Sequence, residues 1–265
     1  MINRFLEKTK QGKFTIGTFF EFGHAAVAEV MGMTNLDYFI IDCEHGPYDI
    51  ESAADVIRAA EGISNCKVTP FARAKDSSRP SILKLLDVGA KGIIIPHVPS
   101  LEEAKQIVEY GKYKPIGDRG VAVSRSVKYG LDATTQNGTE AWFRECNEKE
   151  LLIPQCETMG CLEHIEEIMA LEGIDGVFVG PYDLSTAMGI TAKFDDPKFI
   201  AAINRIIKAA KDNGKFAICY VDTPELAAER RAAGYDSVTI RLDSEVYFTG
   251  LNNMVNEVKE AAGIA

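Results

Sequence analysis

The chain has 265 residues, of which 46% are hydrophobic, and its 29 Lys and Arg against 39 Asp and Glu give a formal net charge of -10. This length suits one large α/β domain over residues 1–265, with a core that needs no disulfides. The lack of a basic block argues against binding of nucleic acid or of an anionic membrane surface. No apolar run reaches the roughly 20 residues of a membrane-spanning helix. Six scattered cysteines without a C-x-x-C pair favour a reducing cytoplasm.

Short β-rich runs alternate with amphipathic stretches along the whole chain. We predict strands near residues 14–20, 37–44, 67–73, 92–98, 150–157, 176–180, 216–221 and 237–242. Helices fit near residues 24–34, 49–61, 79–88, 100–110, 158–171, 197–213, 223–233 and 244–262. Eight βα units of this kind predict a (β/α)8 TIM barrel, with parallel strands inside and helices outside.

One stretch interrupts this alternation. Residues 112–138 are rich in Gly, Lys, Ser, Thr and Asn and have no clear period, and a short amphipathic piece follows at 139–148. A long excursion in a compact domain is usually functional or disordered. Because it also carries charged residues, we interpret it as a loop that could cover the mouth of the barrel.

Four of the predicted strands end in ionisable residues that a buried strand has no structural reason to carry. These runs are 38–45, 68–73, 151–157 and 176–183. A charge inside a core is costly. The C-terminal ends of parallel strands, in contrast, are where barrel enzymes keep their catalytic residues. The four strand ends therefore define the candidate active site.

Two carboxylates, Glu157 and Asp183, lie one βα unit apart and should end neighbouring strands. Such a pair can share one hard divalent cation and leave positions open for substrate and water. The alternative is that each residue caps the helix that follows, a role for which Asp is favoured. Their occurrence on adjacent strands favours the metal site.

His45 and Arg73 are again one βα unit apart, at the ends of the second and third strands. His is the usual general base near neutral pH. Arg can hold a carboxylate or a developing oxyanion. Asp42 and Glu44 flank His45, and an acid in this position can orient the imidazole ring. The alternative is a surface His-Gly-Pro turn beside a salt bridge.

Two further residues, Gln155 and Asp87, have alternative interpretations. Gln155 lies on the same face of its strand as Glu157, because side chains alternate with a period of two. It either donates to a substrate oxygen or fills the barrel interior. Asp87, in the predicted helix 79–88, is a solvated residue or an acid that pairs with His45 or a neighbouring subunit. His97 follows the fourth strand and could line the mouth.

Five ordered motifs carry a resemblance to a known family. They are FIIDCEH at 39–45, ILKLLDVGA at 82–90, GDRGV at 117–121, QCET at 155–158 and GVFVGPYDLS at 176–185. With these motifs the chain resembles the HpcH/HpaI aldolases, the class II pyruvate aldolases of the phosphoenolpyruvate/pyruvate barrel superfamily. The resemblance spans nearly the whole chain and is specific for the family, though not for a substrate.

The resemblance implies a homo-oligomer, such as a trimer of dimers, in which the last helix of each barrel is exchanged with a partner subunit. It implies that Glu157 and Asp183 hold Mg²⁺, Mn²⁺ or Co²⁺. It further implies that His45 performs acid/base catalysis, aided by Asp42 and Asp87.

The resemblance also implies how a 2-oxoacid binds. Arg73 and Gln155 would contact pyruvate, and backbone amides of Gly180, Tyr182 and Asp183, around Pro181, would receive its carboxylate. A 4-hydroxy-2-oxoacid would then be cleaved into an aldehyde and pyruvate, through a pyruvate enolate. His45 would remove the proton of the C4 hydroxyl, and the reverse reaction is aldol addition.

Two departures from the family pattern bear on specificity. Tyr182 stands where the family often has Ala, and His97 stands where it often has an aliphatic residue. The tyrosine ring could narrow the pocket for the aldehyde, so the acceptor, the stereochemistry and the preferred metal stay open. The competing functions are a related lyase that acts on an acyl-CoA ester such as malyl-CoA or on a phosphonate, and a non-catalytic pyruvate-binding barrel.

Overall fold

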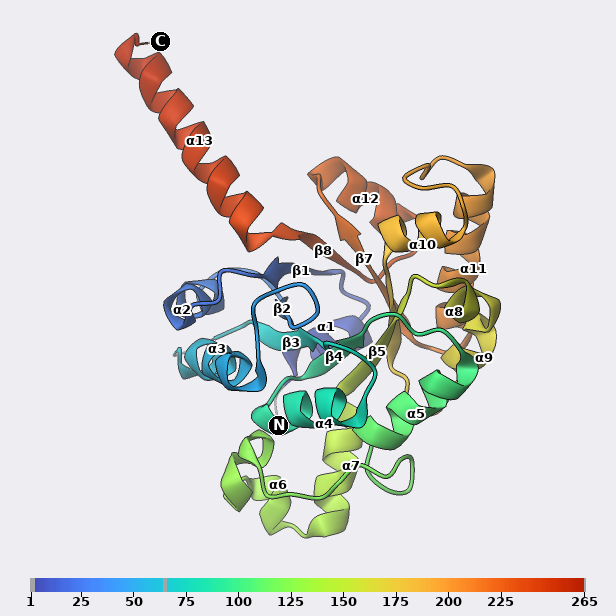
Figure 1. Ribbon diagram of the computed structural model, residues 1–265. Coiled ribbons are helices and arrows are strands. Elements are labelled where there is room, and N and C mark those ends of the chain that lie inside the picture. Colours follow the sequence, from blue (N-terminus) through green and yellow to red (C-terminus); the bar gives the residue numbers. More distant parts are fainter. Residues whose placement is uncertain (1–2, 64–65, 265) are drawn as a thin grey trace.

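Eight parallel strands close into one barrel in the order of the sequence, and the last strand returns to pair with the first (Figure 1). The computed structural model describes residues 3–63 and 66–264. The strands are β1 (Thr15–Phe20), β2 (Tyr38–Asp42), β3 (Thr69–Arg73), β4 (Gly92–Ile95), β5 (Leu151–Cys156), β6 (Gly176–Val179), β7 (Phe216–Val221) and β8 (Ser237–Leu242). This topology confirms the predicted (β/α)8 barrel.

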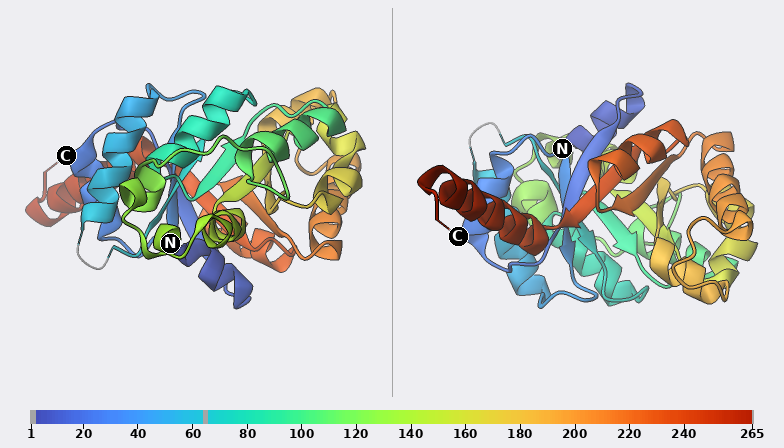
Figure 2. Two further views of the ribbon diagram at one scale, coloured as in Figure 1. Left: turned by 90° about the horizontal axis from the view of Figure 1, so that it is seen from below. Right: turned by 90° about the horizontal axis from the view of Figure 1, so that it is seen from above.

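Helices form the layer around this sheet (Figure 2). The elements that follow the strands are α2 (Ala25–Gly32), α3 (Ile50–Gly62), α4 (Arg79–Val88), α5 (Leu101–Gly111), α8 (Met159–Glu163), α9 (Ile165–Ala170), α10 (Pro181–Ala187), α11 (Pro197–Asp212), α12 (Pro224–Ala232) and α13 (Asp243–Ala262). The helix predicted over 158–171 is two helices, because the backbone of His164 ends α8 and starts α9. The short helix α10 was not predicted.

The N-terminal end of the barrel is closed by α1 (Arg4–Lys10), a second helix that the sequence pattern did not predict. Phe5 is completely buried, and its ring meets those of Tyr38, Phe71 and Phe216 edge-on at centroid distances of 5.2, 5.0 and 5.1 Å. Asn3 donates to the backbone oxygens of Lys91 and Lys149 and fixes the start of the helix. A site inside the barrel must therefore open at the other end.

Inside the barrel, a glycine on one strand makes room for an aromatic ring on the adjacent strand. A Cβ on Gly17 would lie 2.3 Å from the ring of Tyr38, and one on Gly92 would lie 2.7 Å from the ring of Phe71. This pairing of a small with a large residue is a common way to fill a narrow barrel. Residues of the opposite strand face pack against the helices, so both faces of the sheet are buried, which explains the continuously apolar strands.

The stretch 112–138 lies at the N-terminal end of the barrel, so its interpretation as a loop over the mouth is wrong. Arg125 donates to the backbone oxygen of Val88 at 2.8 Å and pairs with Glu61 at 2.6 Å, at the ends of α4 and α3. Because α3 and α4 run antiparallel to the strands, their C-terminal ends lie beside the N-terminal ends of the strands. The stretch connects α5 to β5, and connections from helix to strand lie at this end of a (β/α)8 barrel. It contains η1 (Arg125–Gly130) and α6 (Ala133–Gln136), and α7 (Thr139–Lys149) follows.

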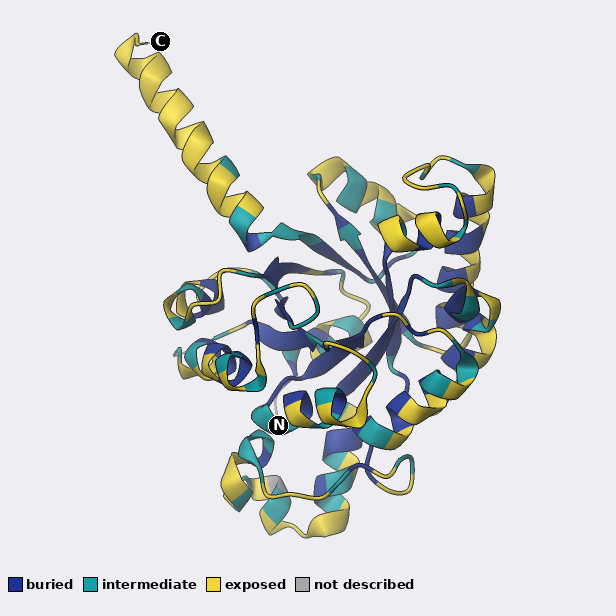
Figure 3. Cartoon of the chain, viewed as in Figure 1, coloured by how far each residue is buried: buried dark blue, intermediate teal, exposed yellow. Residues whose placement is uncertain are grey.

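The last helix, α13, projects away from the barrel and is exposed along most of its length, beyond its buried first residue (Figure 3). An apolar stripe follows one side of it at helical spacing. Its members, Tyr247, Phe248, Leu251, Met254, Val255 and Val258, are 50–67% exposed. Within residues 3–63 and 66–264, no helix is both long and apolar enough to cross a membrane.

Candidate active site

At the open end of the barrel, an ion pair joins the ends of β2 and β3. Nε of Arg73 donates to Oδ1 of Asp42 at 2.8 Å, and Nη2 donates to Oδ2 at 2.6 Å. The two residues are direct register partners in the sheet, which brings both side chains to the same level. Asp42 is completely buried. This two-point contact fixes the plane of the guanidinium group.

The remaining surroundings of Arg73 keep it charged and aimed across the mouth. Its Nη1 lies 3.2 Å from Glu44, and the guanidinium carbon lies 4.8 Å from the centre of the Phe19 ring. Burial opposes the charge, but the hydrogen bond to Asp42 and the nearby carboxylates of Glu44 and Glu157 outweigh it and raise the pKa of Arg73. The predicted role of a fixed cationic donor is consistent with this geometry.

His45 sits on a tight turn that Asp42 organises. Oδ1 of Asp42 accepts the backbone N–H groups of Glu44 at 3.1 Å and of His45 at 3.4 Å. The His45 side chain is 71% exposed, and its Nε2 lies 3.8 Å from Oε2 of Glu44. Asp42 therefore supports His45 through the backbone, whereas Glu44 faces the imidazole ring. The ring is free to meet a substrate that enters the mouth.

Glu157 is the buried carboxylate of the site. It is only 8% exposed, its Oε1 accepts the backbone N–H of His97 at 2.6 Å, and its Oε2 accepts the side-chain amide of Gln155. Burial is the main reason that its pKa is raised; Asp183 raises it further, while the hydrogen bonds and Arg73 oppose the shift. A Cβ on Gly180 would lie 2.8 Å from Oε2, so a larger residue there would displace this carboxylate.

Asp183 is exposed in the first turn of α10, next to this buried acid. The helix begins after Gly180, which has no capping side chain, and Asp183 is the third helical residue. After β5, Thr158 caps α8 by accepting the N–H of Cys161. Neither carboxylate of the predicted pair is thus a helix cap. Pro181 and Tyr182 complete the first turn, and the ring of Tyr182 is 54% exposed.

Two acids of the mouth were missed by the sequence argument. Asp243, after β8, accepts the backbone N–H groups of Glu21 at 2.9 Å and of Phe22 at 3.2 Å. Burial raises the pKa of both Glu21 and Asp243, and Asp42 raises that of Glu21 further. Glu21 follows the buried β1, so the rule applied to the other four strands would have found it, whereas Asp243 follows β8, which reads SVTIRL and is less clearly apolar.

Asp87 is not brought to the mouth of its own barrel. It lies in the last turn of α4, at the opposite end, where its Oδ1 pairs with Nη2 of Arg119 at 3.0 Å. Arg119 also pairs with the buried Glu150. Within one chain, an interaction between Asp87 and His45 is therefore absent from the structure of the described residues.

The donor set of the mouth suits a hard divalent cation. Oxygen is the ligand that Mg²⁺ and Mn²⁺ prefer, and Glu157 and Asp183 supply carboxylates from adjacent strands. Oε1 of Gln155 is buried beside them without a hydrogen-bond partner. Among the described residues no three His, Cys, Asp or Glu side chains converge, so substrate and water would have to complete the coordination.

Comparison with known proteins decides the family. The model of the HpcH/HpaI aldolase/citrate lyase family matches residues 15–248. The chain belongs to this family. Membership makes it an enzyme, a carbon–carbon lyase, and confirms the resemblance seen in the sequence motifs.

Relatives of known sequence and structure share this HpcH/HpaI architecture. The 2-keto-3-deoxy-L-rhamnonate aldolase of Escherichia coli K12 is 31% identical over 252 residues, which are 94% of this chain and 91% of that protein. The HpcH/HpaI aldolase of Desulfitobacterium hafniense DCB-2 is 28% identical, with a TM-score of 0.84 over 96% of both chains. A family protein of Burkholderia cenocepacia J2315 shares the fold, with a TM-score of 0.87 over 97% of this chain and 100% of that one, at 24% identity.

Proposed function

We propose that the protein is a divalent-metal-dependent aldolase that cleaves a 4-hydroxy-2-oxoacid into pyruvate and an aldehyde, or joins them in reverse. The observation that carries this proposal is that Arg73, Glu157 and Asp183, after β3, β5 and β6, lie near one another on one rim, where Arg73 and Asp183 each influence the pKa of Glu157. Such an arrangement places one fixed cation and one pair of oxygen ligands around the same space.

Glu157 and Asp183 would hold Mg²⁺, Mn²⁺ or Co²⁺. When bound, the ion would act as a Lewis acid that polarises the 2-oxo group and favours negative charge on its oxygen. Arg73 would bind the same oxygen region and stabilise the charge that develops there. The amide of Gln155 already donates to Glu157 and would orient this carboxylate toward the ion.

The chain's own groups would bind the substrate carboxylate and move the proton. The backbone amides of Gly180, Tyr182 and Asp183, around Pro181, would receive the carboxylate of pyruvate. His45 would accept the proton of the C4 hydroxyl, directly or through a water, as the C3–C4 bond breaks. Asp42 would act by positioning Arg73 and the turn of His45. Asp87 would assist His45 only from a neighbouring subunit, since it lies at the far end of its own barrel.

The substrate class follows from the family and from Tyr182. The Escherichia coli relative is named for 2-keto-3-deoxy-L-rhamnonate. We therefore propose 2-keto-3-deoxy sugar acids as the first substrates to examine. The ring of Tyr182 packs edge-on against Phe194 at 5.0 Å between centroids. Because Tyr182 belongs to the segment that would receive the pyruvate carboxylate, its ring would limit the room for the aldehyde.

We propose further that the enzyme is a cytoplasmic homo-oligomer, such as a trimer of dimers, in which α13 packs on a partner subunit. The apolar stripe on α13 supports the exchange, because an isolated helix with so much exposed apolar surface would be poorly soluble. The six free cysteines support a reducing compartment.

The test is a coupled assay for pyruvate release. The protein is incubated with Mg²⁺ and a series of 4-hydroxy-2-oxoacids, and separately with malyl-CoA, whose cleavage is followed by the release of glyoxylate and acetyl-CoA. Pyruvate release from a hydroxy-oxoacid, abolished by EDTA and restored by Mg²⁺ or Mn²⁺, is the expected result. Turnover of malyl-CoA alone would favour the acyl-CoA lyase. Binding of pyruvate without any turnover, and without exchange of its C3 protons, would favour the non-catalytic barrel.

A further inference from the structure

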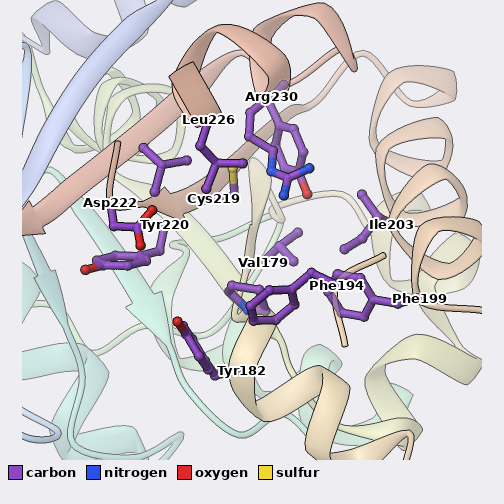
Figure 4. A pocket seen from close by; sticks show the side chains of 13 residues that line it. Val179, Tyr182, Phe194, Phe199, Ile203, Cys219, Tyr220, Asp222, Leu226 and Arg230 are labelled. Carbon is purple, nitrogen blue, oxygen red and sulfur yellow. The ribbon is translucent and has the colours of Figure 1, made fainter. Parts of the chain in front are cut away.

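A cavity of about 250 Å³ lies beside the mouth, between the outer face of the sheet and helices α11 and α12 (Figure 4). From the sheet it is lined by Val179 and Cys219, which alternate with the inward-facing Phe178 and Ile218. Val179 and Cys219 place the cavity on the outer face of the sheet, and Tyr220, which packs against the interior cluster, lines the edge that it shares with the mouth. Phe194, Phe199, Ile203 and Leu226 form apolar walls, while Tyr182, Tyr220 and Asp222 line the end next to the mouth.

Two hydrogen-bond donors face this apolar space. Tyr235 is 4% exposed, and Arg230 reaches in from α12. Neither the phenol nor the guanidinium group has a hydrogen-bond or ion-pair partner within the part of the chain that the structure describes. Because α12 runs from the mouth back toward the start of β8, the half-buried Arg230 lies at the end of the cavity away from the mouth, close to Tyr235, which precedes β8. Burial raises the pKa of Tyr235, so its hydroxyl stays a donor.

We propose that this cavity is a binding site for a small carboxylate with an apolar body. Arg230 and the hydroxyl of Tyr235 would hold the carboxylate, and the apolar walls would cover the body. The guanidinium of Arg230, in the last turn of α12, matches a single negative charge, while the carboxylate of Asp222 lines the other end of the cavity, next to the mouth. A few convergent polar groups in a mostly apolar pocket are typical of small-molecule sites. The volume suits a molecule of the size of benzoate. Pro181 and Tyr182 form part of the wall, so the occupant would touch the segment that carries Asp183.

The experiment is calorimetric titration of the full-length protein with benzoate. We expect saturable binding of one benzoate per chain, and weaker binding of the uncharged analogue benzamide. Arg230→Gln should weaken benzoate binding by about tenfold or more, because a charge-assisted hydrogen bond is lost. Arg231→Gln is the matched control: Arg231 lies on the same helix but over the ring of Phe14, outside the cavity, and its variant should bind as the wild type does.

Further variants separate this site from the mouth. Arg73→Gln should bind benzoate normally, while Leu226→Trp should abolish binding by filling the cavity. Tyr235→Phe gives an independent test should Arg230→Gln fold poorly, as judged by circular dichroism. Equal affinity in the Arg230 and Arg231 variants, loss of binding in Arg73→Gln alone, or no saturable binding at millimolar benzoate would each overturn the proposal. None of these outcomes depends on aldolase activity.

Discussion

The backbone N–H of His97 donates to Oε1 of Glu157 at 2.6 Å, and His97 adopts a left-handed conformation with φ of 50° to do so. A non-glycine residue in this conformation costs about 1 kcal/mol or more. The His97 side chain itself is exposed. The backbone of His97, rather than its imidazole, therefore fixes the buried carboxylate.

This relationship predicts opposite results for two substitutions of His97. His97→Gly should fold at least as stably and keep comparable turnover, because glycine adopts the left-handed conformation without strain. His97→Val should lose about 1–2 kcal/mol of stability, because a β-branched residue is disfavoured there. Urea unfolding and steady-state pyruvate release measure both effects. Loss of activity in His97→Gly at unchanged stability would show that the imidazole matters instead.

The two-point contact between Asp42 and Arg73 predicts that lysine cannot replace this arginine. Arg73→Lys keeps the charge but loses the planar fork, so kcat should fall by about 10²-fold or more. Arg205→Lys is the matched control, since Arg205 makes the same fork with Glu166 at 2.7 and 2.6 Å on the surface. That variant should keep wild-type kcat. Equal kcat values for the two variants would show that the guanidinium group of Arg73 has no role in the reaction.

Lys215, at the N-terminal end of the barrel, predicts how the free energy of unfolding depends on pH. Burial is the main cause that lowers its pKa to about 8, and its Nζ donates to the backbone oxygen of Leu171 at 2.6 Å. The folded state thus binds this proton less tightly than the unfolded state. Its contribution to stability should therefore rise between about pH 8 and pH 10.5. Relative to Lys215→Met, the wild type should gain stability over this range in urea unfolding, whereas the exposed Lys10→Met should show no such difference. A pH-independent gap between wild type and Lys215→Met would contradict the shift.

The apolar stripe of α13 predicts a loss of assembly when it becomes polar. Phe248→Asp combined with Val255→Asp should convert the oligomer to a smaller species in light scattering coupled to size-exclusion chromatography. Asn252→Asp adds a charge between these positions and should leave the assembly intact. A wild-type protein that elutes as a monomer at micromolar concentration would exclude the proposed exchange of this helix.

Much of this architecture could be predicted from the sequence, because it depends on local signals. Apolar runs of the right length predicted all eight strands, and the acids and bases after them predicted the rim of the mouth. The helix α10 was missed because its seven residues, which start at Pro181, are too few for a periodic pattern. The predicted position of residues 112–138 over the mouth was wrong because it was based on their charged residues. The topology of the barrel places every helix-to-strand connection at the N-terminal end instead.

The contacts that aim the side chains could not be predicted from the sequence. No pattern indicates that the backbone of His97 bonds to Glu157 across β4 and β5, because this depends on the register of strands and on one unusual φ angle. Asp87 illustrates the same limit. Its motif matched the family, but only the fold shows that α4 carries it away from its own mouth to Arg119.

The most direct test of the proposed mechanism is the exchange of the C3 protons of pyruvate with deuterium, followed by NMR in D₂O. Exchange reports the enolate without the need to know the aldehyde. We predict rapid exchange with Mg²⁺ or Mn²⁺, none after exhaustive EDTA treatment, and strong loss in Glu157→Gln and Asp183→Asn. Exchange that persists unchanged without metal, or in the Glu157 variant, would contradict the assignment of these two carboxylates.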